Sequence, residues 1–394
     1  MKQRLFTPGP TELLPEAQVA MSGRMPHHRK EDFKAIFAET RQLLRSIYRT
    51  EHEVLILASS GTGAMEGAVA NLLSPGDEAL VAVTGKFGER WVELCKAYGA
   101  TAQTIVPGPG QAVDPSQIEQ ALAQNPNIAA VFVQACDTST GVANDVEAIG
   151  AIVERCKDTC LVVDAITALG VSPVETDGWG LDVVVSGSQK AFMIPPGLAF
   201  VAVSPKACRK IEVSRSPRYY FDFRKELKHQ KEAQSAWTPA ISLIVGLHAS
   251  LRWIESFGLD KLIANAGRLA AVTRAATNAL GLEQYSRSPA NAVTALKVPS
   301  GLSGGDLVRR LREEFGLVVA GGQGDLKGKI IRIAHLGYYD FLDTIGVLAG
   351  LEIALQRMGH PVELGCGVQA ALREYAEQAP GSRLQAPGVR ELAD

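Results

Sequence analysis

The sequence lacks several features that would assign it to a simple class of protein. It has 40 lysine and arginine residues against 42 aspartate and glutamate residues, a formal net charge of −2. Nucleic-acid binding usually needs a concentrated basic face, so this balance argues against a polyanionic partner. No uninterrupted apolar run approaches the roughly 20 residues of a membrane-spanning helix, and the first residues contain no apolar signal core. We therefore expect a cytoplasmic protein that binds neither nucleic acid nor membranes.

Cysteine and histidine are sparse and are not spaced for metal binding. The six cysteines contain no Cys-x-x-Cys pair. Cys156 and Cys160 lie four residues apart, but no second pair or nearby histidine completes a zinc set. The seven histidines show no His-Glu-x-x-His spacing. We therefore interpret the cysteines as reduced, small apolar residues and predict no metal site.

Chain length and hydrophobic patterning predict more than one domain. A chain of 394 residues is long for a single hydrophobic core. Over the first two-thirds, short apolar runs alternate with helical segments, which is typical of a mostly parallel, doubly wound α/β sheet. We predict an N-terminal arm at 1–20, a large domain at 21–257, a smaller α+β domain at 258–378 and a flexible tail at 379–394.

The expected elements follow from the same patterning. Strands are predicted at 54–58, 80–83, 101–106, 128–134, 161–164, 183–186, 198–203, 292–298 and 330–334. Helices are predicted at 64–73, 88–98, 116–123, 145–156, 241–257, 259–280, 305–315, 341–358 and 368–378. The stretch 211–236 is polar and aromatic without clear periodicity. We predict that it is a long loop that covers a site or reaches a neighbouring subunit.

Three features lie where predicted strands end. The segment Ser60-Gly61-Thr62-Gly63-Ala64 follows one strand and opens a helix, Asp164 ends a second strand, and Lys190 follows a third. Ligands of such sheets bind beyond the carboxyl ends of the strands, so one pocket can hold all three features. Pyridoxal phosphate (PLP) needs this set: backbone N–H donors for its phosphate, a carboxylate for its pyridine nitrogen and an amine for its aldehyde.

The glycine-rich segment and the aspartate also have interpretations without this cofactor. The segment could be a purely structural turn. Dinucleotide binding is disfavoured, because the spacing Gly61-x-Gly63-x-x-x-Gly67 is one residue too long and no acidic residue ends the next strand. Asp164 could equally cap a helix or contact a metal or a ribose.

Lys190, Phe87 and Arg332 have patterns that suggest function without proving it. The apolar runs 183–185 and 192–194 would desolvate the Lys190 amine, which lowers its pKa and favours attack on an aldehyde. Phe87 could stack on a planar ring or belong to the core at a helix start. Arg332 lies in a strand of apolar residues and needs an anion. A substrate carboxylate or the acid of a structural salt bridge would supply it.

In combination, these motifs resemble the class V aminotransferases of fold type I and, among them, the alanine–glyoxylate and serine–glyoxylate aminotransferase group. The resemblance runs from Thr7 to about Met358. It implies a large domain with a mostly parallel seven-stranded sheet, a smaller C-terminal α+β domain, and a homodimer with active sites shared between subunits. The segments that carry it are Thr7-Pro8-Gly9-Pro10, Ser60-Gly61-Thr62-Gly63, Asp137-Thr138-Ser139-Thr140-Gly141, Val163-Asp164-Ala165, Ser186-Gly187-Ser188-Gln189-Lys190, Thr238-Pro239-Ala240-Ile241-Ser242 and Arg332-Ile333-Ala334-His335.

The resemblance also implies a role for each matched residue. Lys190 would bond to the cofactor's aldehyde as the internal aldimine, and Asp164 would pair with the pyridine nitrogen. Phe87 would stack on the ring, where many relatives have tryptophan, and Thr138 would hydrogen-bond near the ring hydroxyl. The whole cofactor-binding set implied is Gly61, Thr62, Gly63, Ala64, Phe87, Thr138, Asp164, Gln189, Lys190 and Thr238.

Phosphate and substrate contacts follow in the same way. Gly63, Ala64 and Gln189 would hold the phosphate, and Thr238 would reach it from the partner subunit. Arg332 would bind the substrate carboxylate beside the backbone of Pro8 and Gly9. One departure concerns the segment Gln234-Ser235-Ala236-Trp237, which lacks the tyrosine that relatives often place shortly before the threonine.

The expected activity is ping-pong transfer of an amino group from serine or alanine to a small 2-oxo acid such as glyoxylate or pyruvate. Gln189 precedes the lysine where cysteine desulfurases carry histidine, which favours transamination. Three alternatives remain open: a 2-aminoethylphosphonate–pyruvate transaminase, a nucleotide-dependent oxidoreductase, and a non-catalytic PLP-fold subunit of a larger complex. The chain is also similar to proteins described as a small subunit of a soluble hydrogenase, but it has no cysteine pairs to hold a metal cluster.

Overall fold

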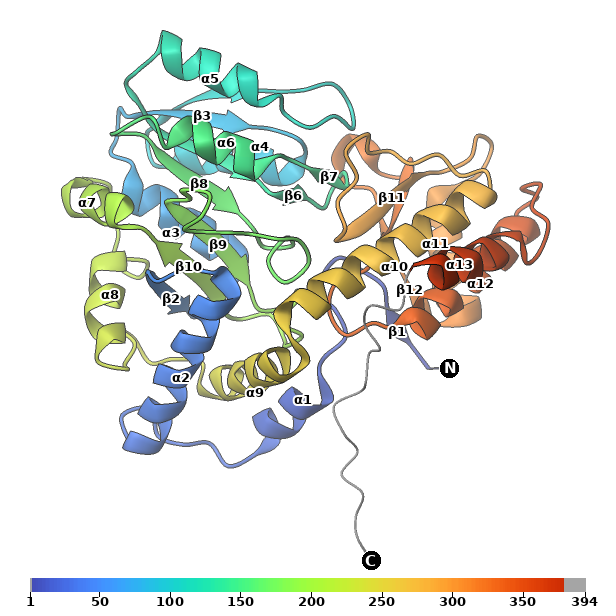
Figure 1. Cartoon of the computed structure of the whole chain (residues 1–394), viewed down its shortest axis with the longest axis horizontal. Helices are drawn as coiled ribbons and strands as arrows, with labels where there is room; N and C mark the ends of the chain where they lie inside the picture. Colours follow the sequence, from blue (N-terminus) through green and yellow to red (C-terminus); the bar gives the residue numbers. More distant parts are fainter. Residues whose placement is uncertain (1, 379–394) are drawn as a thin grey trace, which may run out of the picture.

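The computed structural model describes residues 2–378, so the tail predicted at 379–394 lies outside the described residues. At its centre is a seven-stranded sheet with the order β2-β10-β9-β8-β5-β3-β4 (Figure 1). Within this sheet β10 alone runs antiparallel to its neighbours. The strands are β2 (Glu53–Leu57), β3 (Glu78–Ala82), β4 (Thr101–Ile105), β5 (Ile128–Gln134), β8 (Cys160–Asp164), β9 (Val183–Gly187) and β10 (Ala199–Val203).

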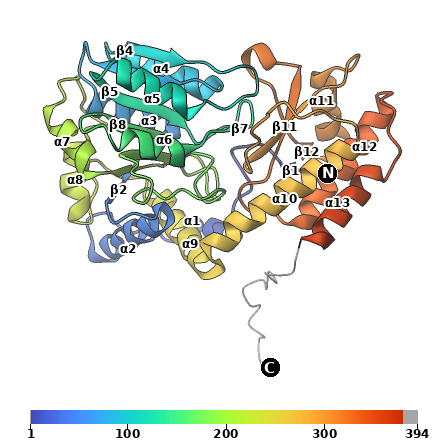
Figure 2. The ribbon, with the colours of Figure 1, turned by 45° about the horizontal axis from the view of Figure 1, so that its top comes forward.

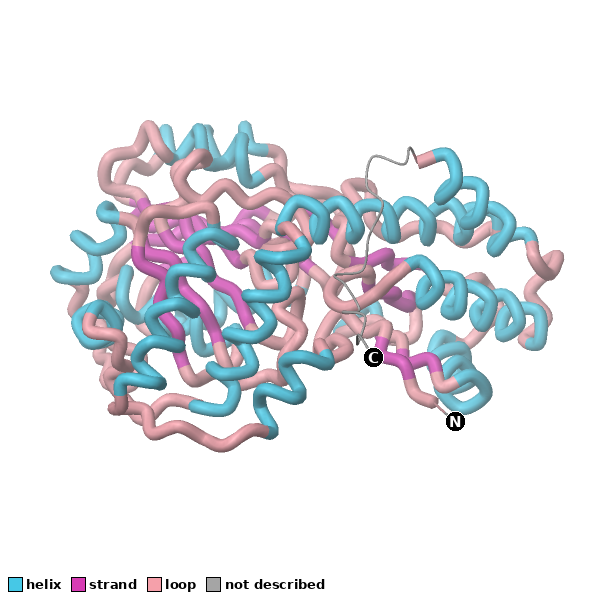
Figure 3. The backbone as a smooth tube through the Cα atoms, turned by 60° about the horizontal axis from the view of Figure 1, so that its bottom comes forward, coloured by secondary structure: helices cyan, strands magenta, loops and turns pink. Residues whose placement is uncertain are grey.

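Helices bury both faces of this sheet (Figure 3). In β2, Leu55 and Leu57 join one hydrophobic cluster, whereas Val54 and Ile56 join the other. Strands buried on both sides are nearly continuous apolar runs, which is why the sequence pattern located them. One cluster contains residues of α3 (Gly61–Leu72), α4 (Lys86–Ala97), α7 (Pro205–Val213) and α8 (Phe223–Lys231), and the other contains residues of α2 (Glu31–Tyr48), α5 (Pro115–Gln124), α6 (Val146–Val153) and α9 (Ile241–Phe257).

A second, smaller sheet is formed by the C-terminal part of the chain. Its order is β11-β14-β13, and both pairings are antiparallel. Figure 2 shows the long helix α10 running from the large sheet toward this smaller one. The seven-stranded sheet described above confirms the predicted α/β fold class with a mostly parallel sheet. The domain boundary between residues 257 and 258 remains a prediction. The elements are α10 (Leu259–Ala279), β11 (Val293–Lys297), α11 (Gly304–Phe315), β13 (Ala320–Gly321), η1 (Gly324–Leu326), β14 (Ile330–Ala334), α12 (Phe341–Arg357) and α13 (Cys366–Glu377).

The N-terminal segment connects the two parts of the molecule. Its strand β1 (Arg4–Leu5) pairs in parallel with β12 (Leu317–Val318), so the N-terminus lies beside the smaller sheet (Figure 1). The chain then crosses to the large sheet, where the backbone N–H groups of Thr11 and Leu14 donate to the carbonyls of Gln189 and Met193. Helix α1 (Pro15–Ser22) then packs on α9. Residues 5–14 therefore lie between the smaller sheet and the loop that carries Lys190.

The structure differs from the predicted elements in two places. No helix was predicted before β2, although α1 and α2 lie there. The long loop predicted at 211–236 is wrong in part, because α7 extends to Val213 and α8 occupies 223–231. Helix α8 is almost wholly polar and is set by tertiary contacts and by the Asp222 side chain, which caps its first turn. No helix within residues 2–378 is long and apolar enough to span a bilayer.

Candidate active site

The carboxyl ends of β2, β8 and β9 meet at a cavity of about 160 Å³, which we call the Lys190 cavity. The sheet topology explains this convergence, since these three strands run in the same direction and β10 lies between two of them. The cavity is lined by Ser60, Gly61, Thr62, Phe87, Arg90, Cys136, Thr138, Asp164, Ile166, Thr167, Gln189 and Lys190. Seven residues predicted from the sequence are therefore brought together: Gly61, Thr62, Phe87, Thr138, Asp164, Gln189 and Lys190.

Lys190 is buried. The residue is only 9% exposed, and its Nζ donates a hydrogen bond to the carbonyl of Pro8 in the N-terminal segment. Burial lowers the pKa of this amine to about 8, although the nearby Asp164 carboxylate acts in the opposite direction. An amine with this pKa is partly unprotonated near neutral pH and can therefore act as a nucleophile.

Asp164 supplies a buried carboxylate to the same cavity. The residue is 3% exposed, and its Oδ1 accepts a hydrogen bond of 2.9 Å from the backbone N–H of Ile166. Burial raises the pKa of the carboxyl group to about 7, while the hydrogen bond and the charges of Lys190 and Arg90 lower it. A protonated ring nitrogen beside it would supply a compensating charge and hold the carboxylate ionised.

The start of α3 supplies the anion-binding part of the site. Its N-cap residue, Ser60, makes no side-chain capping bond. Backbone N–H groups at the start of an uncapped helix are available to an anion, and the helix dipole favours negative charge there. A Cβ at Gly61 would lie 2.6 Å from Ile166 Cδ1, so a larger residue there would force the Ile166 side chain to move. Gly63 and Ala64 are buried in this turn but do not line the cavity, so their phosphate contacts remain predictions.

Asp137 organises the wall that contains Phe87 and Thr138, a function that the sequence analysis did not assign to it. Its carboxylate is fully buried and accepts hydrogen bonds from the backbone N–H groups of Phe87, at 3.0 Å, and Gly88, at 3.3 Å. It also accepts from Ser139 N and Oγ. Burial raises the pKa of Asp137, and these hydrogen bonds oppose the shift. This one carboxylate therefore ties the start of α4 to the loop that presents Thr138.

Arg332 lies on β14 at the boundary between the smaller sheet and the Lys190 cavity. It is 4% exposed, its Nε donates to the Gly321 carbonyl at 2.9 Å, and its NH1 donates to the Thr138 carbonyl at 2.7 Å. No ion pair to it is found within residues 2–378, so the salt bridge considered from the sequence is not observed there. Two of five N–H donors are used, and the others remain for an anion.

Pro8 and Gly9 lie directly against Lys190, and their predicted place beside a substrate carboxylate stays a prediction. Gly9 adopts φ +125°, and a Cβ at this position would collide with the Lys190 amine and its side-chain carbons. The arm is held there by Thr11, whose Oγ1 donates to the Lys190 carbonyl at 3.0 Å. Glycine is therefore required at position 9 for both its backbone conformation and its small size.

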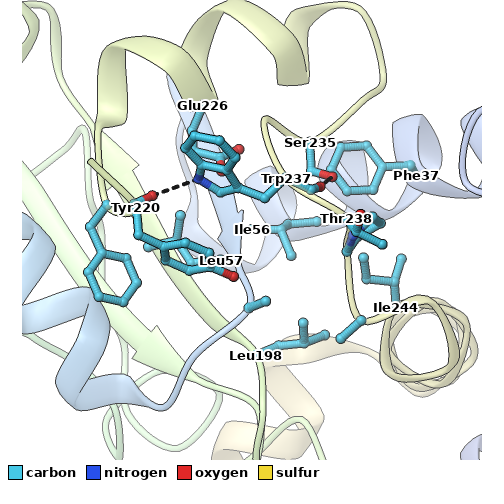
Figure 4. A pocket seen from close by; sticks show the side chains of 14 residues that line it. Phe37, Ile56, Leu57, Leu198, Tyr220, Glu226, Ser235, Trp237, Thr238 and Ile244 are labelled. Atoms are coloured by element: carbon cyan, nitrogen blue, oxygen red, sulfur yellow. Dashed lines mark hydrogen bonds between the residues drawn. The ribbon is translucent and has the colours of Figure 1, made fainter. Parts of the chain in front are cut away.

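Thr238 does not line the Lys190 cavity of its own chain. It lies in a separate small pocket with Trp237 and Tyr220 (Figure 4). The Trp237 Nε1 donates to the Tyr220 carbonyl at 2.9 Å, and both Tyr219 and Tyr220 stack on the indole ring. The predicted contact of Thr238 with the phosphate in a partner subunit stays a prediction.

Several residues that line the cavity were not predicted. Ile166 and Thr167 directly follow Asp164, and Ser60 begins the glycine-rich segment, so their proximity could have been inferred. Arg90 lies three residues after Phe87 on α4, and residues so spaced share a helix face. The spacing therefore indicates that Arg90 lies beside Phe87. No pattern in the sequence indicates that Cys136 belongs to the site, because only the strand order places it beside Asp164.

These residues fit PLP in kind and in position. A buried carboxylate, a buried amine of lowered pKa, an uncapped helix start and an aromatic side chain surround one cavity. Fold and site together define a PLP-binding α/β enzyme. A family model described as aminotransferase class-V matches residues 15–327. The chain belongs to the class V aminotransferase family, whose members use PLP.

Known relatives agree with this family. The chain is 39% identical over 380 residues to the soluble hydrogenase 42 kDa subunit of Anabaena cylindrica, covering 95% of this chain and 99% of that one. It is 34% identical to the serine–glyoxylate aminotransferase of Arabidopsis thaliana over 94% of both chains. Among solved structures, an aspartate aminotransferase of subgroup IV from Thermus thermophilus matches with a TM-score of 0.85 and 35% identity, covering 90% of this chain and 100% of that one.

Proposed function

We propose that this aminotransferase transfers the amino group of serine or alanine to a small 2-oxo acid, with glyoxylate as the preferred acceptor and pyruvate as the other candidate. The observation that carries the proposal is the buried guanidinium of Arg332, which has no acidic partner within residues 2–378, donates to the carbonyl of the cavity residue Thr138 and is near enough to Lys190 to lower its pKa. One guanidinium binds one carboxylate in a bidentate manner, which suits amino acids with a single carboxyl group. The similarity to a serine–glyoxylate aminotransferase supports the same choice.

The side chains act on the substrate and on its α-proton. PLP, when bound, supplies an aldehyde for the amino group and a ring that withdraws electrons. Arg332 would hold the substrate carboxylate and so orient the Cα–H bond toward Lys190. Lys190 Nζ would then accept the α-proton as general base and return it as general acid. Asp164 would keep the ring nitrogen protonated, and the Pro8–Gly9 backbone would limit the space to small substrates.

We also propose a homodimer whose two sites each contain residues of both subunits. Tyr219 is 70% exposed and Tyr220 is 44% exposed, and both stack on Trp237 next to Thr238. An exposed aromatic cluster of this kind is typical of a protein–protein contact. Its position beside Thr238 supports the predicted reach of that residue toward a partner's phosphate.

The test is a spectral and kinetic screen of purified, PLP-saturated protein. Serine, alanine, glycine, aspartate and 2-aminoethylphosphonate are added in turn, and the loss of the yellow absorbance band is recorded before and after addition of glyoxylate. A response to serine or alanine, reversed by glyoxylate, is expected. A response to 2-aminoethylphosphonate alone would overturn the proposed substrates.

Aspartate is the second candidate donor, because a solved relative is an aspartate aminotransferase. Its distal carboxylate would need a second cation, and Arg90, the other arginine at this site, donates to Thr62 at the start of α3, where the phosphate is expected to bind. Aspartate should therefore react more slowly than serine. A non-catalytic role, suggested by relatives named as hydrogenase subunits, predicts protein that stays colourless when PLP is added.

A further inference from the structure

Arg90 is a cationic residue in the Lys190 cavity to which neither the sequence motifs nor the mechanism assigns a function. It lies on the first turns of α4, three residues after Phe87, and its guanidinium carbon is 4.9 Å from the centre of the Phe87 ring. Its NH1 donates to Thr62 Oγ1 at 3.0 Å. Within residues 2–378 it forms no ion pair, although it is partly buried and lines the cavity.

Arg90 lines the cavity, whereas Arg332 is not among its lining residues and contacts the carbonyl of Thr138. Burial is the main cause that lowers the pKa of Lys190, and Arg332 is near enough to lower it further. Asp164 has its pKa raised mainly by burial, and Arg90 is among the charges that oppose this shift. Arg332, which donates to the Thr138 carbonyl, therefore acts on Lys190, whereas Arg90, which donates to Thr62, lies at the start of α3 and acts on Asp164.

The hydrogen bond to Thr62 has a consequence for the hydroxyl group. Because Thr62 Oγ1 accepts from Arg90, its own proton is not used in that bond and can be donated to an anion. Thr62 also lies in the first turn of α3, where backbone N–H groups are uncapped. Arg90 therefore orients a hydroxyl donor toward the place where an anion is favoured.

The charge balance at this end of the cavity requires a cation. A phosphate ester carries a charge of about −1.5 to −2 near neutral pH, whereas a helix N-terminus contributes only about +0.5. Among the residues that line the cavity, Arg90 is the cation at this end, since Lys190 is committed to the aldehyde. We propose that Arg90 is the counter-charge for the phosphate of PLP, acting both directly and by orienting the Thr62 hydroxyl.

This inference depends on the cofactor of the family and not on the amino donor. Two other functions of Arg90 can be distinguished from it. If Arg90 only supported the Phe87 ring, it would affect binding of the cofactor ring with or without a phosphate. If it bound the distal carboxylate of a dicarboxylic amino acid, it would affect that substrate and leave cofactor affinity unchanged.

The experiment compares two aldehydes that differ in the phosphate alone. Apo-protein of wild type, Arg90→Gln and Arg90→Lys is titrated with PLP and with unphosphorylated pyridoxal, and the absorbance of the lysine adduct gives each Kd. Lys86→Gln is the matched control, because it removes a charge from the same helix turn at an exposed ion pair with Glu89. Circular dichroism and melting of each apo-protein establish that it is folded.

We expect R90Q to raise the Kd for PLP by about tenfold or more, with a change of less than about threefold for pyridoxal, as loss of a charge-assisted hydrogen bond to phosphate implies. R90K should lose less than R90Q, and K86Q should match wild type. Inorganic phosphate should raise the melting temperature of wild-type apo-protein more than that of R90Q.

Three results would overturn the proposal: equal losses for PLP and pyridoxal, no loss for either, or unchanged cofactor affinity with loss of aspartate turnover alone. If R90Q does not fold, R90K carries the comparison, because lysine keeps the charge but not the guanidinium fork. A PLP-specific loss is then still expected, and its absence would count against the proposal. Failure of serine and alanine as donors would leave the result unaffected.

Discussion

At the scale of single residues, burial changes the acid–base behaviour of Lys190 and Asp164 in opposite directions. It lowers the pKa of the amine to about 8 and raises that of the carboxyl group to about 7. A much larger share of the Lys190 amine is therefore unprotonated near neutral pH than in an ordinary lysine, whose pKa is about 10.4. The site therefore has a reactive amine before any substrate arrives.

This shift predicts a pH profile for cofactor capture. The rate at which apo-protein takes up PLP should rise with pH, inflect near 8 and then level off, because only the unprotonated amine attacks the aldehyde. In Asp164→Asn the inflection should move below 8, since the Asp164 carboxylate raises the pKa of the amine. Stopped-flow absorbance measures both profiles, and an inflection near 10 in wild type would contradict this account.

A second prediction at this scale concerns Arg332. Replacement by lysine removes the planar fork but keeps the charge, so Arg332→Lys should raise the KM for the amino donor by about 10- to 100-fold. The Kd for PLP should stay within about twofold, because Arg332 is not among the residues that line the Lys190 cavity. Steady-state kinetics with a parallel PLP titration checks this, and equal losses in both would assign Arg332 to the cofactor instead.

At the scale of elements, helix α8 protects the free edge of the large sheet. The side chain of Gln230 donates to the Ile56 carbonyl at 2.8 Å and accepts from the Ile56 N–H at 3.0 Å, and its backbone carbonyl accepts from Arg41. Strand β2 is the last strand on this side. An amide side chain therefore satisfies backbone groups that an edge strand would otherwise leave unpaired.

Gln230→Ala should consequently destabilise the protein by about 2–4 kcal/mol, because two buried backbone groups lose their partners. Lys228→Ala on the same helix is the control, since this side chain is exposed and should change stability by less than about 0.5 kcal/mol. Urea unfolding of apo-protein followed by circular dichroism measures the difference. Equal midpoints for the two variants would show that the edge does not depend on Gln230.

At the scale of the whole molecule, the site depends on parts that lie far apart in the chain. Lys190 is positioned by the N-terminal segment, which is itself held by β12 and by the Ala334 N–H of β14, which donates to the Phe6 carbonyl. The Thr138 loop is tied to β14 by Arg332. Both connections cross between the two sheets, so their relative position sets the shape of the cavity.

The proposed dimer leads to a test by mixed subunits. Lys190→Ala and Thr238→Ala each damage every site of their own homodimers. In a mixed dimer with shared sites, one of the two sites combines Lys190 of one subunit with Thr238 of the other and is intact. Random mixing should therefore restore about a quarter of wild-type activity. No recovery beyond the sum of the two variants would show that Thr238 acts within its own subunit.

The sequence alone determined the class of fold and the central chemistry of the site. Strands buried on both faces are continuous apolar runs, and polar residues that follow them lie at one edge of a parallel sheet. The glycine-rich segment 60–64, Asp164 and Lys190 could therefore be assigned to one site. Periodicity failed for α8, because its polar sequence is held by contacts with a distant strand. The roles assigned to Gly63, Ala64 and Thr238 are still predictions.

Only the tertiary structure decided which other residues join this site. The strand order places Cys136 beside Asp164, and the fold of α4 brings Arg90 to Thr62. Asp137 ties two wall segments about 50 residues apart in the chain, and the Pro8 carbonyl reaches Lys190 across 182 residues. The physical reason is common to all: periodicity reports which face of an element is buried, whereas contacts between distant segments depend on how the elements pack.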